Sequence, residues 1–210
     1  MLQTSFVPAQ EKESRHLMVV LHGLGDSAEG FRWLPDSLNL PWMNYLLVNA
    51  PDEYHGGFSW YDIFDNPQEG IERSRPLLFM LLDEQRRTGF PADQTFLFGF
   101  SQGCLMTLEA ALRFPTQLAG FIGISGYAHE PEQAVRELST VASQQEILMT
   151  HGLSDPLIPI EKVRAQVQLL QKASLRIDWR EFAKAHTIAG EEEISVIRQF
   201  VCDRARVRST

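Results

Sequence analysis

The chain has 210 residues, 44% of them hydrophobic and 22% charged, a composition that fits one globular domain with a substantial core. Its 27 acidic residues outnumber its 19 basic residues, and the formal net charge of −8 argues against electrostatic binding to nucleic acid or to an anionic membrane surface. The two cysteines, Cys104 and Cys202, have no metal-binding spacing, so we expect neither a disulfide nor a bound metal or other cofactor.

No charged N-terminal segment is followed by an apolar stretch, and no apolar run is long enough to cross a bilayer. We therefore expect a cytoplasmic protein without integral membrane association. The chain contains no internal repeat, linker or low-complexity segment, which favours a single domain over residues 1–210.

Short apolar runs alternate with longer segments of helical periodicity. The first run, His16–Leu21, is apolar after its histidine, which is typical of a strand covered on both faces. Because alternating strands and helices favour right-handed crossovers, the pattern predicts an α/β domain with a mainly parallel sheet. In chain order, we predict strands at residues 16–21, 45–50, 95–98, 120–126, 146–150 and 176–182, and helices near 31–34 and at 69–87, 104–113, 131–138, 160–172 and 191–204.

The segment 52–67 lies between a predicted strand and a predicted helix and is rich in glycine and aromatic residues. It is too long for a minimal connector, and long loops in compact domains are often functional. We interpret it as a flap over the functional site. Its aromatic side chains leave a homodimer interface open as an alternative to a substrate mouth.

The segment Gly99-Phe100-Ser101-Gln102-Gly103 joins the predicted strand at 95–98 to the predicted helix at 104–113. Gly-x-Ser-x-Gly at such a junction is typical of a nucleophile elbow, in which glycines are needed because a Cβ would clash with the folded-back chain. The helix that follows directs its partial positive charge at the serine. The pattern therefore predicts Ser101 as a nucleophile; a chance glycine-bracketed loop is the alternative.

A serine nucleophile requires a base and an acid that orients the base, and in the hydrolase order these follow the serine as acid, then histidine. Asp155 lies in a proline-stiffened loop directly after a predicted strand, whereas Asp178 lies inside an alternating strand and is the weaker candidate. His186 is the only histidine after Asp155. Its imidazole could accept the serine proton near neutral pH. The alternatives are a turn aspartate that caps a helix and a solvated loop histidine.

An oxyanion hole needs two backbone N–H groups, one from the residue after the nucleophile and one from a loop after an early strand. These are Gln102 and Leu24, and the glycines on either side of Leu24 allow a close approach of the backbone. His22 and His151 each precede a glycine at a strand end, and we interpret both as structural residues that hydrogen-bond the loops.

Loops near the same sheet edge also predict an apolar acyl pocket, with ordinary core positions as the alternative. The residues expected to line it are Leu24, Phe58, Trp60, Leu157 and Ile158.

Five motifs occur in this order: Leu21-His22-Gly23-Leu24-Gly25-Asp26, Gly99-Phe100-Ser101-Gln102-Gly103, Ile124-Ser125-Gly126, His151-Gly152-x-x-Asp155-Pro156-x-x-Pro159 and His186. Together with Ser59-Trp60-Tyr61-Asp62, which is similar to a tryptophan motif, they resemble the carboxylesterase/acyl-protein thioesterase family of α/β hydrolases over nearly the whole chain. The resemblance implies an α/β-hydrolase fold that acts on carboxylic esters, lysophospholipids or acyl thioesters without a metal. It also implies a triad of Ser101, Asp155 and His186, with Leu24 and Gln102 as oxyanion donors.

Two positions depart from the family pattern. Ala185 stands where family members usually have glycine before the catalytic histidine, and Cys104 stands where a second glycine often follows the elbow. Neither change removes a catalytic group, but Ala185 could shift the histidine loop and Cys104 could narrow the packing behind Ser101.

The expected function is a serine hydrolase that cleaves a small-molecule ester or an acylated substrate through an acyl-enzyme. An acyltransferase would use the same triad with an alcohol in place of water, and a non-catalytic binding protein would not need all three residues. A dienelactone hydrolase is disfavoured because that family usually has cysteine at the elbow. Metal-dependent hydrolysis is disfavoured because the histidines and carboxylates lack ligand spacing.

Overall fold

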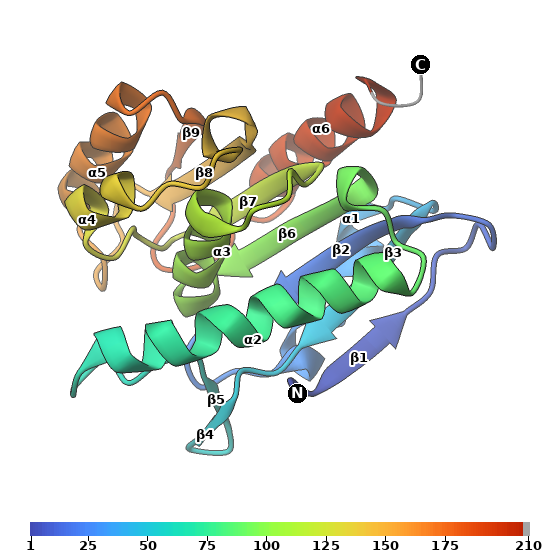
Figure 1. The fold of residues 1–210 in the computed structure, drawn as a ribbon, viewed down its shortest axis with the longest axis horizontal. Coiled ribbons are helices and arrows are strands. Elements are labelled where there is room, and N and C mark those ends of the chain that lie inside the picture. The colour runs from blue at the N-terminus through green and yellow to red at the C-terminus, as the bar shows by residue number, and fades with distance from the viewer. Residues whose placement is uncertain (208–210) are drawn as a thin grey trace.

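The computed structural model describes residues 1–207, which fold around one seven-stranded sheet (Figure 1). The strand order is β1-β3-β2-β6-β7-β8-β9, and every neighbouring pair is parallel except β1 with β3. The prediction of an α/β fold with a mainly parallel sheet is confirmed. The strands of this sheet are β1 (Thr4–Val7), β2 (His16–Leu21), β3 (Met43–Val48), β6 (Thr95–Phe100), β7 (Gly120–Ile124), β8 (Glu146–Gly152) and β9 (Arg176–Phe182).

Helices cover both faces of the sheet. In Figure 1, α2 to α5 lie in front of the sheet, and α1 and α6 lie behind it. Each face has its own cluster of buried apolar side chains. The front helices are α2 (Pro67–Arg87), α3 (Gln102–Arg113), α4 (Pro131–Arg136) and α5 (Ile160–Lys172), and the rear helices are α1 (Leu34–Leu38) and α6 (Glu191–Val207). Short 3-10 turns lie at Ala28–Phe31, Ala92–Gln94 and Ala142–Gln144.

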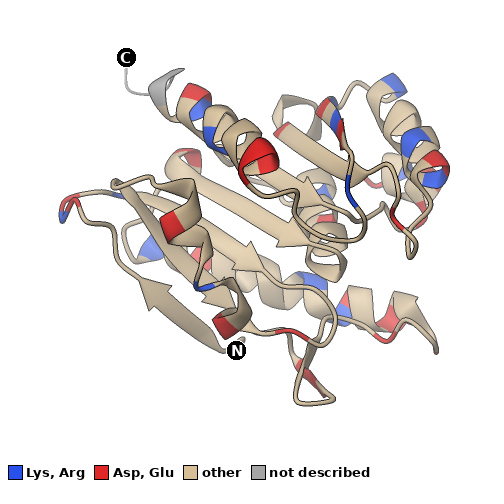
Figure 2. Cartoon of the chain, turned by 180° about the vertical axis from the view of Figure 1, so that it is seen from behind, with Lys and Arg blue, Asp and Glu red and all other residues tan. Residues whose placement is uncertain are grey.

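The four strands at the centre of the sheet, β3, β2, β6 and β7, contain no Asp, Glu, Lys or Arg. Figure 2 shows the charged residues on the helices, the loops and the sheet margins. A strand covered by helices on both faces must be apolar throughout, which is why these segments read as continuous hydrophobic runs. Among the helices of the described residues, none is both long and apolar enough to cross a bilayer.

β2 and β6 are parallel neighbours, but the chain adds further strands in opposite directions from them. From β2 the chain adds β3 on one side, and from β6 it adds β7, β8 and β9 on the other. Loops that leave the carboxyl ends of strands at such a switch point diverge and leave a crevice between them, where open α/β sheets bind their ligands. The glycine-rich loop follows the carboxyl end of β2, and the elbow at Ser101 follows the carboxyl end of β6. Both therefore lie at this crevice.

The segment 52–67 contains a two-stranded hairpin, β4 (Asp52–Tyr54) and β5 (Gly57–Ser59). Phe58 N donates to Asp26 O at 2.9 Å, and Gly25 N donates to Phe58 O at 2.9 Å, so the hairpin is tied to the loop after β2. Trp60 and the residue after it are buried, whereas the hairpin tip at His55 and Gly56 and the stretch 62–66 are exposed. The hairpin of this segment is thus hydrogen-bonded to the body of the domain, and its interpretation as a flap over the site stays a prediction.

Most predicted elements have boundaries within a few residues of those found, and β2, α5 and β9 match at both ends. The sequence analysis missed β1, β4 and β5. β1 is an edge strand of four residues with no fully buried position, so its sequence lacks the apolar run by which the central strands are recognised.

Candidate active site

Ser101 lies at the turn between β6 and α3. Its backbone has φ 55° and ψ −113°, a conformation that residues other than glycine rarely adopt. Ser101 N donates to Ile124 O at 2.9 Å, and Leu105 N donates to Ser101 O at 3.2 Å, so the strained residue is held from both sides. This is the geometry of a nucleophile elbow, in which a sharp turn exposes the hydroxyl at the carboxyl edge of the sheet.

The two glycines of the elbow stand where no side chain fits. A Cβ at Gly99 would lie 2.1 Å from Gly103 O, and a Cβ at Gly103 would lie 2.2 Å from Leu21 O. Both contacts are with backbone atoms, which cannot rotate away. The prediction that glycines are required by the folded-back chain is confirmed.

Ser101, His186 and Asp155 form one hydrogen-bonded row. His186 Nε2 lies 2.9 Å from Ser101 Oγ, and His186 Nδ1 lies 2.7 Å from Asp155 Oδ2. With its proton on Nδ1, the imidazole donates to the carboxylate and accepts a hydrogen bond from the hydroxyl. In this arrangement Nε2 can take the serine proton while the carboxylate stabilises the charge that forms on the ring.

The side chain of Asp155 is fully buried and held in place by its own loop. Asp155 Oδ1 accepts from Leu157 N at 2.9 Å and from Ile158 N at 3.0 Å. Burial by itself raises the pKa of Asp155, but the Ile158 N–H, His186 and the Leu157 N–H together outweigh burial and hold the pKa below its ordinary value. The carboxylate is therefore ionised near neutral pH and fixed in orientation.

The loop that carries Leu24 lies against the elbow. A Cβ at Gly23 would lie 3.2 Å from Ser101 Cβ, and Gly25 has a φ of +77°. Gln102 is the first residue of α3, and the first N–H groups of a helix have no acceptor within it. The backbone segments predicted to form an oxyanion hole thus meet at the serine. The donor role of the two N–H groups stays a prediction.

The side chain of Gln102 has a second role that sequence analysis missed. Gln102 Oε1 accepts from Trp60 N at 3.0 Å, and Gln102 Nε2 donates to Tyr61 O at 2.8 Å. Ser59 Oγ donates to Tyr61 O at 2.8 Å and lies 3.3 Å from Gln102 Oε1. The residue after the serine therefore fastens the segment 59–61 beside the site.

A cavity of about 520 Å³ opens beside Ser101 and His186. Leu24, Leu157 and Ile158 line it, as the sequence analysis expects. Tyr61, Ile63 and Tyr127 also line it, and sequence analysis missed all three. Only their places in the sequence could have suggested this role. Tyr61 and Ile63 lie in the segment 52–67, and Tyr127 follows the Ile124-Ser125-Gly126 motif.

The expectation that Trp60 and Phe58 line the acyl pocket is wrong. Trp60 has no exposed surface, and its Nε1 donates to His22 O at 3.0 Å, so the indole belongs to the core beneath the loop after β2. Phe58 is half-buried, packs against the same core and is absent from the pocket wall. Its backbone is paired with Asp26, which directs the ring toward His22 rather than into the cavity.

His22 and His151 are structural, as expected. His22 Nε2 accepts from Ala50 N at 3.1 Å, and His22 Nδ1 lies 2.6 Å from Gly23 O, so the ring joins two loops at the sheet edge. His151 Nε2 lies 2.9 Å from Ile158 O. Because a carbonyl oxygen only accepts hydrogen bonds, Nε2 carries a proton and donates it to this contact. Burial lowers the pKa of both imidazoles.

Both departures from the family pattern are accommodated. A Cβ at Gly123 would lie 2.7 Å from Cys104 Sγ, and a Cβ at Gly126 would lie 2.6 Å from it, so these two glycines leave the space that the thiol occupies. Ala185 is exposed, so its methyl group is not buried in the histidine loop. Burial raises the pKa of the Cys104 thiol to about 12.

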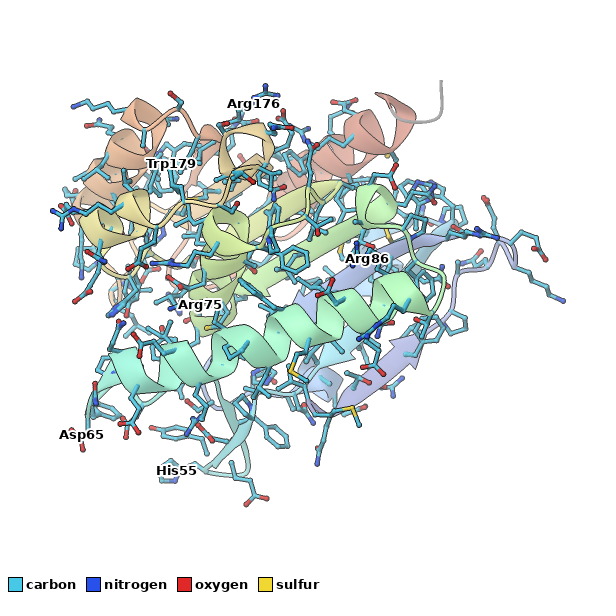
Figure 3. All side chains as sticks on the ribbon, viewed as in Figure 1. His55, Asp65, Arg75, Arg86, Arg176 and Trp179 are labelled. Atoms are coloured by element: carbon cyan, nitrogen blue, oxygen red, sulfur yellow. The ribbon has the colours of Figure 1, made fainter. Side chains whose placement is uncertain are left out.

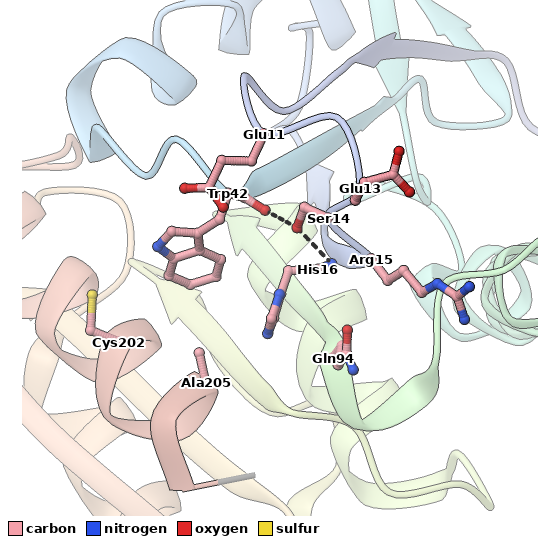
Figure 4. Close-up of a pocket in the computed structure, with 9 residues that line it drawn as sticks. All are labelled: Glu11, Glu13, Ser14, Arg15, His16, Trp42, Gln94, Cys202 and Ala205. Carbon is pink, nitrogen blue, oxygen red and sulfur yellow. Dashed lines mark hydrogen bonds between the residues drawn. The ribbon is translucent and has the colours of Figure 1, made fainter. Parts of the chain in front are cut away.

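A larger hollow of about 660 Å³ lies away from these residues (Figure 4). Its wall includes His16 at the start of β2, Trp42 before β3 and Cys202 of α6. It therefore lies at the amino ends of the strands, where no nucleophile–base pair of the described residues is found. Within residues 1–207, no group of three or more His, Cys, Asp or Glu side chains is arranged to hold a metal ion. Chemistry, rather than cavity size, identifies the site at Ser101.

Comparison with known proteins shows the family to which this chain belongs. Residues 2–202 match the phospholipase/carboxylesterase family. Acyl-protein thioesterase 1 of Schizosaccharomyces pombe is 31% identical over 196 residues, which cover 86% of this chain and 88% of that protein. A probable carboxylesterase of Oryza sativa subsp. japonica is 27% identical over 206 residues, covering 90% of this chain and 77% of that protein. The crystal structure of esterase PE8 has a TM-score of 0.86 at 25% identity, covering 96% of this chain and 98% of that one. The chain is therefore a hydrolase and belongs to the phospholipase/carboxylesterase family.

Proposed function

We propose that this hydrolase cleaves carboxylic esters or acyl thioesters through a covalent acyl-enzyme on Ser101. The observation that carries the proposal is the position of His186, whose two ring nitrogens lie within hydrogen-bond distance of Ser101 Oγ and Asp155 Oδ2. A serine is a weak nucleophile unless such a base removes its proton as it attacks.

In the first half-reaction, Ser101 Oγ attacks the acyl carbonyl carbon while His186 Nε2 takes the hydroxyl proton. The backbone N–H groups of Leu24 and Gln102 stabilise the oxyanion that forms. The tetrahedral intermediate collapses, the bond to the alcohol or thiol breaks, and His186 protonates the leaving group. In the second half-reaction His186 activates water, which releases the carboxylic acid and restores the serine.

The cavity beside Ser101 is the site proposed for the acyl chain. Its wall is mostly apolar, with Leu24, Ile63 and Leu157 among the lining residues, and its volume is about 520 Å³. That space suits acyl groups of short to medium length better than acetyl alone. The name of the fission yeast relative, acyl-protein thioesterase 1, supports testing a thioester beside the oxygen ester.

A second hollow of about 440 Å³ adjoins the first and shares Asp26 and Phe100 with it. Thr187 and Ile188, which follow His186 directly, line this second hollow. Ser101 and His186 themselves line the first hollow, which we assign to the acyl chain. The second hollow, lined by the residues that follow His186, is the space we assign to the alcohol or thiol.

The test is the initial rate of hydrolysis of p-nitrophenyl esters from acetyl to dodecanoyl, and of a thioester of the preferred length, by the wild type and Ser101→Ala. We expect turnover in the wild type that is lost in the variant, with an optimum between the shortest and longest chains. Ser154→Ala, which removes an exposed hydroxyl near Asp155, is the matched control and should keep full activity. A folded Ser101→Ala enzyme that retains wild-type rates would refute the assignment. Addition of a competing alcohol then separates hydrolysis from acyl transfer by the products formed.

A further inference from the structure

A buried ion pair lies beneath the loop that carries His186. Lys184 Nζ donates to Glu193 Oε1 at 2.6 Å, and the two side chains are 2% and 0% exposed. Removing two charges from water is costly, and their attraction repays the cost only when further hydrogen bonds complete the pair. A pair at this depth therefore calls for a specific explanation.

The carboxylate of Glu193 joins three separate segments of the chain. Besides Lys184, it accepts from the hydroxyl of Thr150 through Oε1 and from Ala189 N at 2.6 Å through Oε2. Lys184 and Ala189 stand on either side of His186. Thr150 belongs to β8, the strand that leads to Asp155. One side chain thus holds both ends of the histidine loop against the strand that delivers the acid.

Residues 183–190 form neither helix nor strand, so the loop depends on contacts with other segments for its position. Lys184 O accepts from Ser154 N at 3.1 Å, and a Cβ at Gly152 would lie 2.4 Å from the same oxygen. The backbone at Lys184 therefore packs directly on the segment that leads to Asp155. Any shift of this contact changes the position of His186 relative to the carboxylate that orients it.

We propose that Glu193 and Lys184 are positioning residues, which act through this loop to set the distance and angle of His186 to Asp155 and Ser101. The inference rests on the function proposed above. The pair touches neither substrate nor reacting atoms, and it contributes by keeping the base where proton transfer is efficient.

The pair also lies within electrostatic reach of the site. Burial lowers the pKa of Lys184, and the negative charges of Glu193 and Asp155 oppose that shift. Burial lowers the pKa of His151, and the positive charge of the Lys184 ammonium lowers this pKa further. The charged and titratable groups near the base are thus Asp155, His151, Lys184 and Glu193.

The test compares Glu193→Gln, Lys184→Met and the double variant in the full-length protein, with p-nitrophenyl esters as substrate. The matched control is Glu109→Gln. Glu109 of α3 is 3% exposed and is paired with Arg75 and Arg113, each at 2.9 Å. Arg75 belongs to α2 (Figure 3), so this ion pair joins α2 to α3 and includes no residue of the histidine loop.

We expect Glu193→Gln to lower kcat about 10²-fold with little change in KM, because misplacement of a catalytic group by about 1 Å has an effect of that size. Lys184→Met should lose less, since the bonds to Thr150 and Ala189 remain. The double variant should lose less than the product of the single losses, because the glutamine amide no longer faces the ammonium. Glu109→Gln should lose stability but keep kcat within about twofold.

The pH profile of kcat/KM distinguishes a pair that acts on the triad from a pair that only stabilises the fold. Lys184→Met and Glu193→Gln each leave a buried group of opposite charge near the triad, so they should displace the acidic limb of the profile in opposite directions. The double variant should return the limb toward its wild-type position. Because these groups are buried, added salt should leave the shifts in place.

The inference is overturned if Glu193→Gln loses activity only in proportion to its unfolded fraction, as the Glu109→Gln control does, or if both single variants leave the pH profile unchanged. Should Glu193→Gln fail to fold, Lys184→Met supplies the same kcat and pH measurements with two of the three tethers intact. Failure of the proposed function gives a different result, in which the wild type is inactive or Ser101→Ala is active.

Discussion

Replacement of Gln102 by methionine separates the observed side-chain contacts of this residue from the oxyanion role proposed for its backbone N–H. Methionine is close to glutamine in volume, so no cavity forms, and the backbone N–H at position 102 remains for the oxyanion. The side-chain bonds to Trp60 N and Tyr61 O are lost. The variant therefore tests whether the segment 59–61 is held beside the site by this one amide.

The expected cost follows from the partners left behind. Trp60 N loses its acceptor at 3.0 Å inside the core, and an orphaned buried donor costs about 1–3 kcal/mol. Tyr61 O loses one bond but still accepts from Ser59 Oγ at 2.8 Å, so this loss is worth about 1 kcal/mol. We expect Gln102→Met to lower the free energy of unfolding by about 2–4 kcal/mol.

Urea unfolding followed by tryptophan fluorescence measures this loss, and the ester series measures its effect on the pocket. Because Tyr61 lines the cavity, kcat/KM should fall more for longer acyl chains than for acetyl. Gln145→Met is the control: Gln145 is also fully buried and bonds two backbone groups, Leu118 N at 3.2 Å and Thr116 O at 3.1 Å, far from the serine. It should lose similar stability with no change in chain-length preference. A loss below about 1 kcal/mol for Gln102→Met would refute the reasoning.

Three further predictions concern the elbow, the thiols and the buried histidine. Gly103→Ala should lower the free energy of unfolding by about 3 kcal/mol or more, because its Cβ would lie 2.2 Å from Leu21 O; a thermal midpoint within a degree of wild type would contradict this. A thiol-specific disulfide reagent at pH 8 should modify only Cys202 in the native protein and both cysteines in urea, because Cys104 is fully buried with its pKa raised to about 12. Burial lowers the pKa of His151 below its unfolded value, so the unfolded chain takes up the proton first and stability should fall as pH drops from 7.5 to 5.5. The urea midpoint should follow this trend in the wild type and depend less on pH in His151→Gln.

The parts of the fold that sequence predicts are those with a local cause. The strand at His16–Leu21 is visible because burial on both faces requires a continuous apolar run. The elbow is visible because Gly99 and Gly103 are required by backbone contacts within a few residues or on the neighbouring strand. Asp155 and His186 follow from chain order, since both lie in loops after the carboxyl ends of predicted strands.

The parts that sequence could not predict depend on distant partners. The inward direction of Trp60 is set by the bonds of its backbone to Gln102 and of its indole to His22, 42 and 38 residues away. No local pattern distinguishes this buried indole from one that lines a pocket. The same holds for Glu193, which lies in a run of three glutamates and would be read as a solvated helix start.

The hydrogen bond between His186 and Ser101 spans 85 residues of sequence, and those that fix Trp60 and Thr150 span 42 and 43. Contacts of this range form only after long stretches of chain have lost most of their freedom, which slows folding and delays the contacts themselves. We therefore expect the candidate site to be completed late in the folding reaction. On dilution from urea, helical signal should return before esterase turnover does, and turnover reports the arrival of the complete native packing.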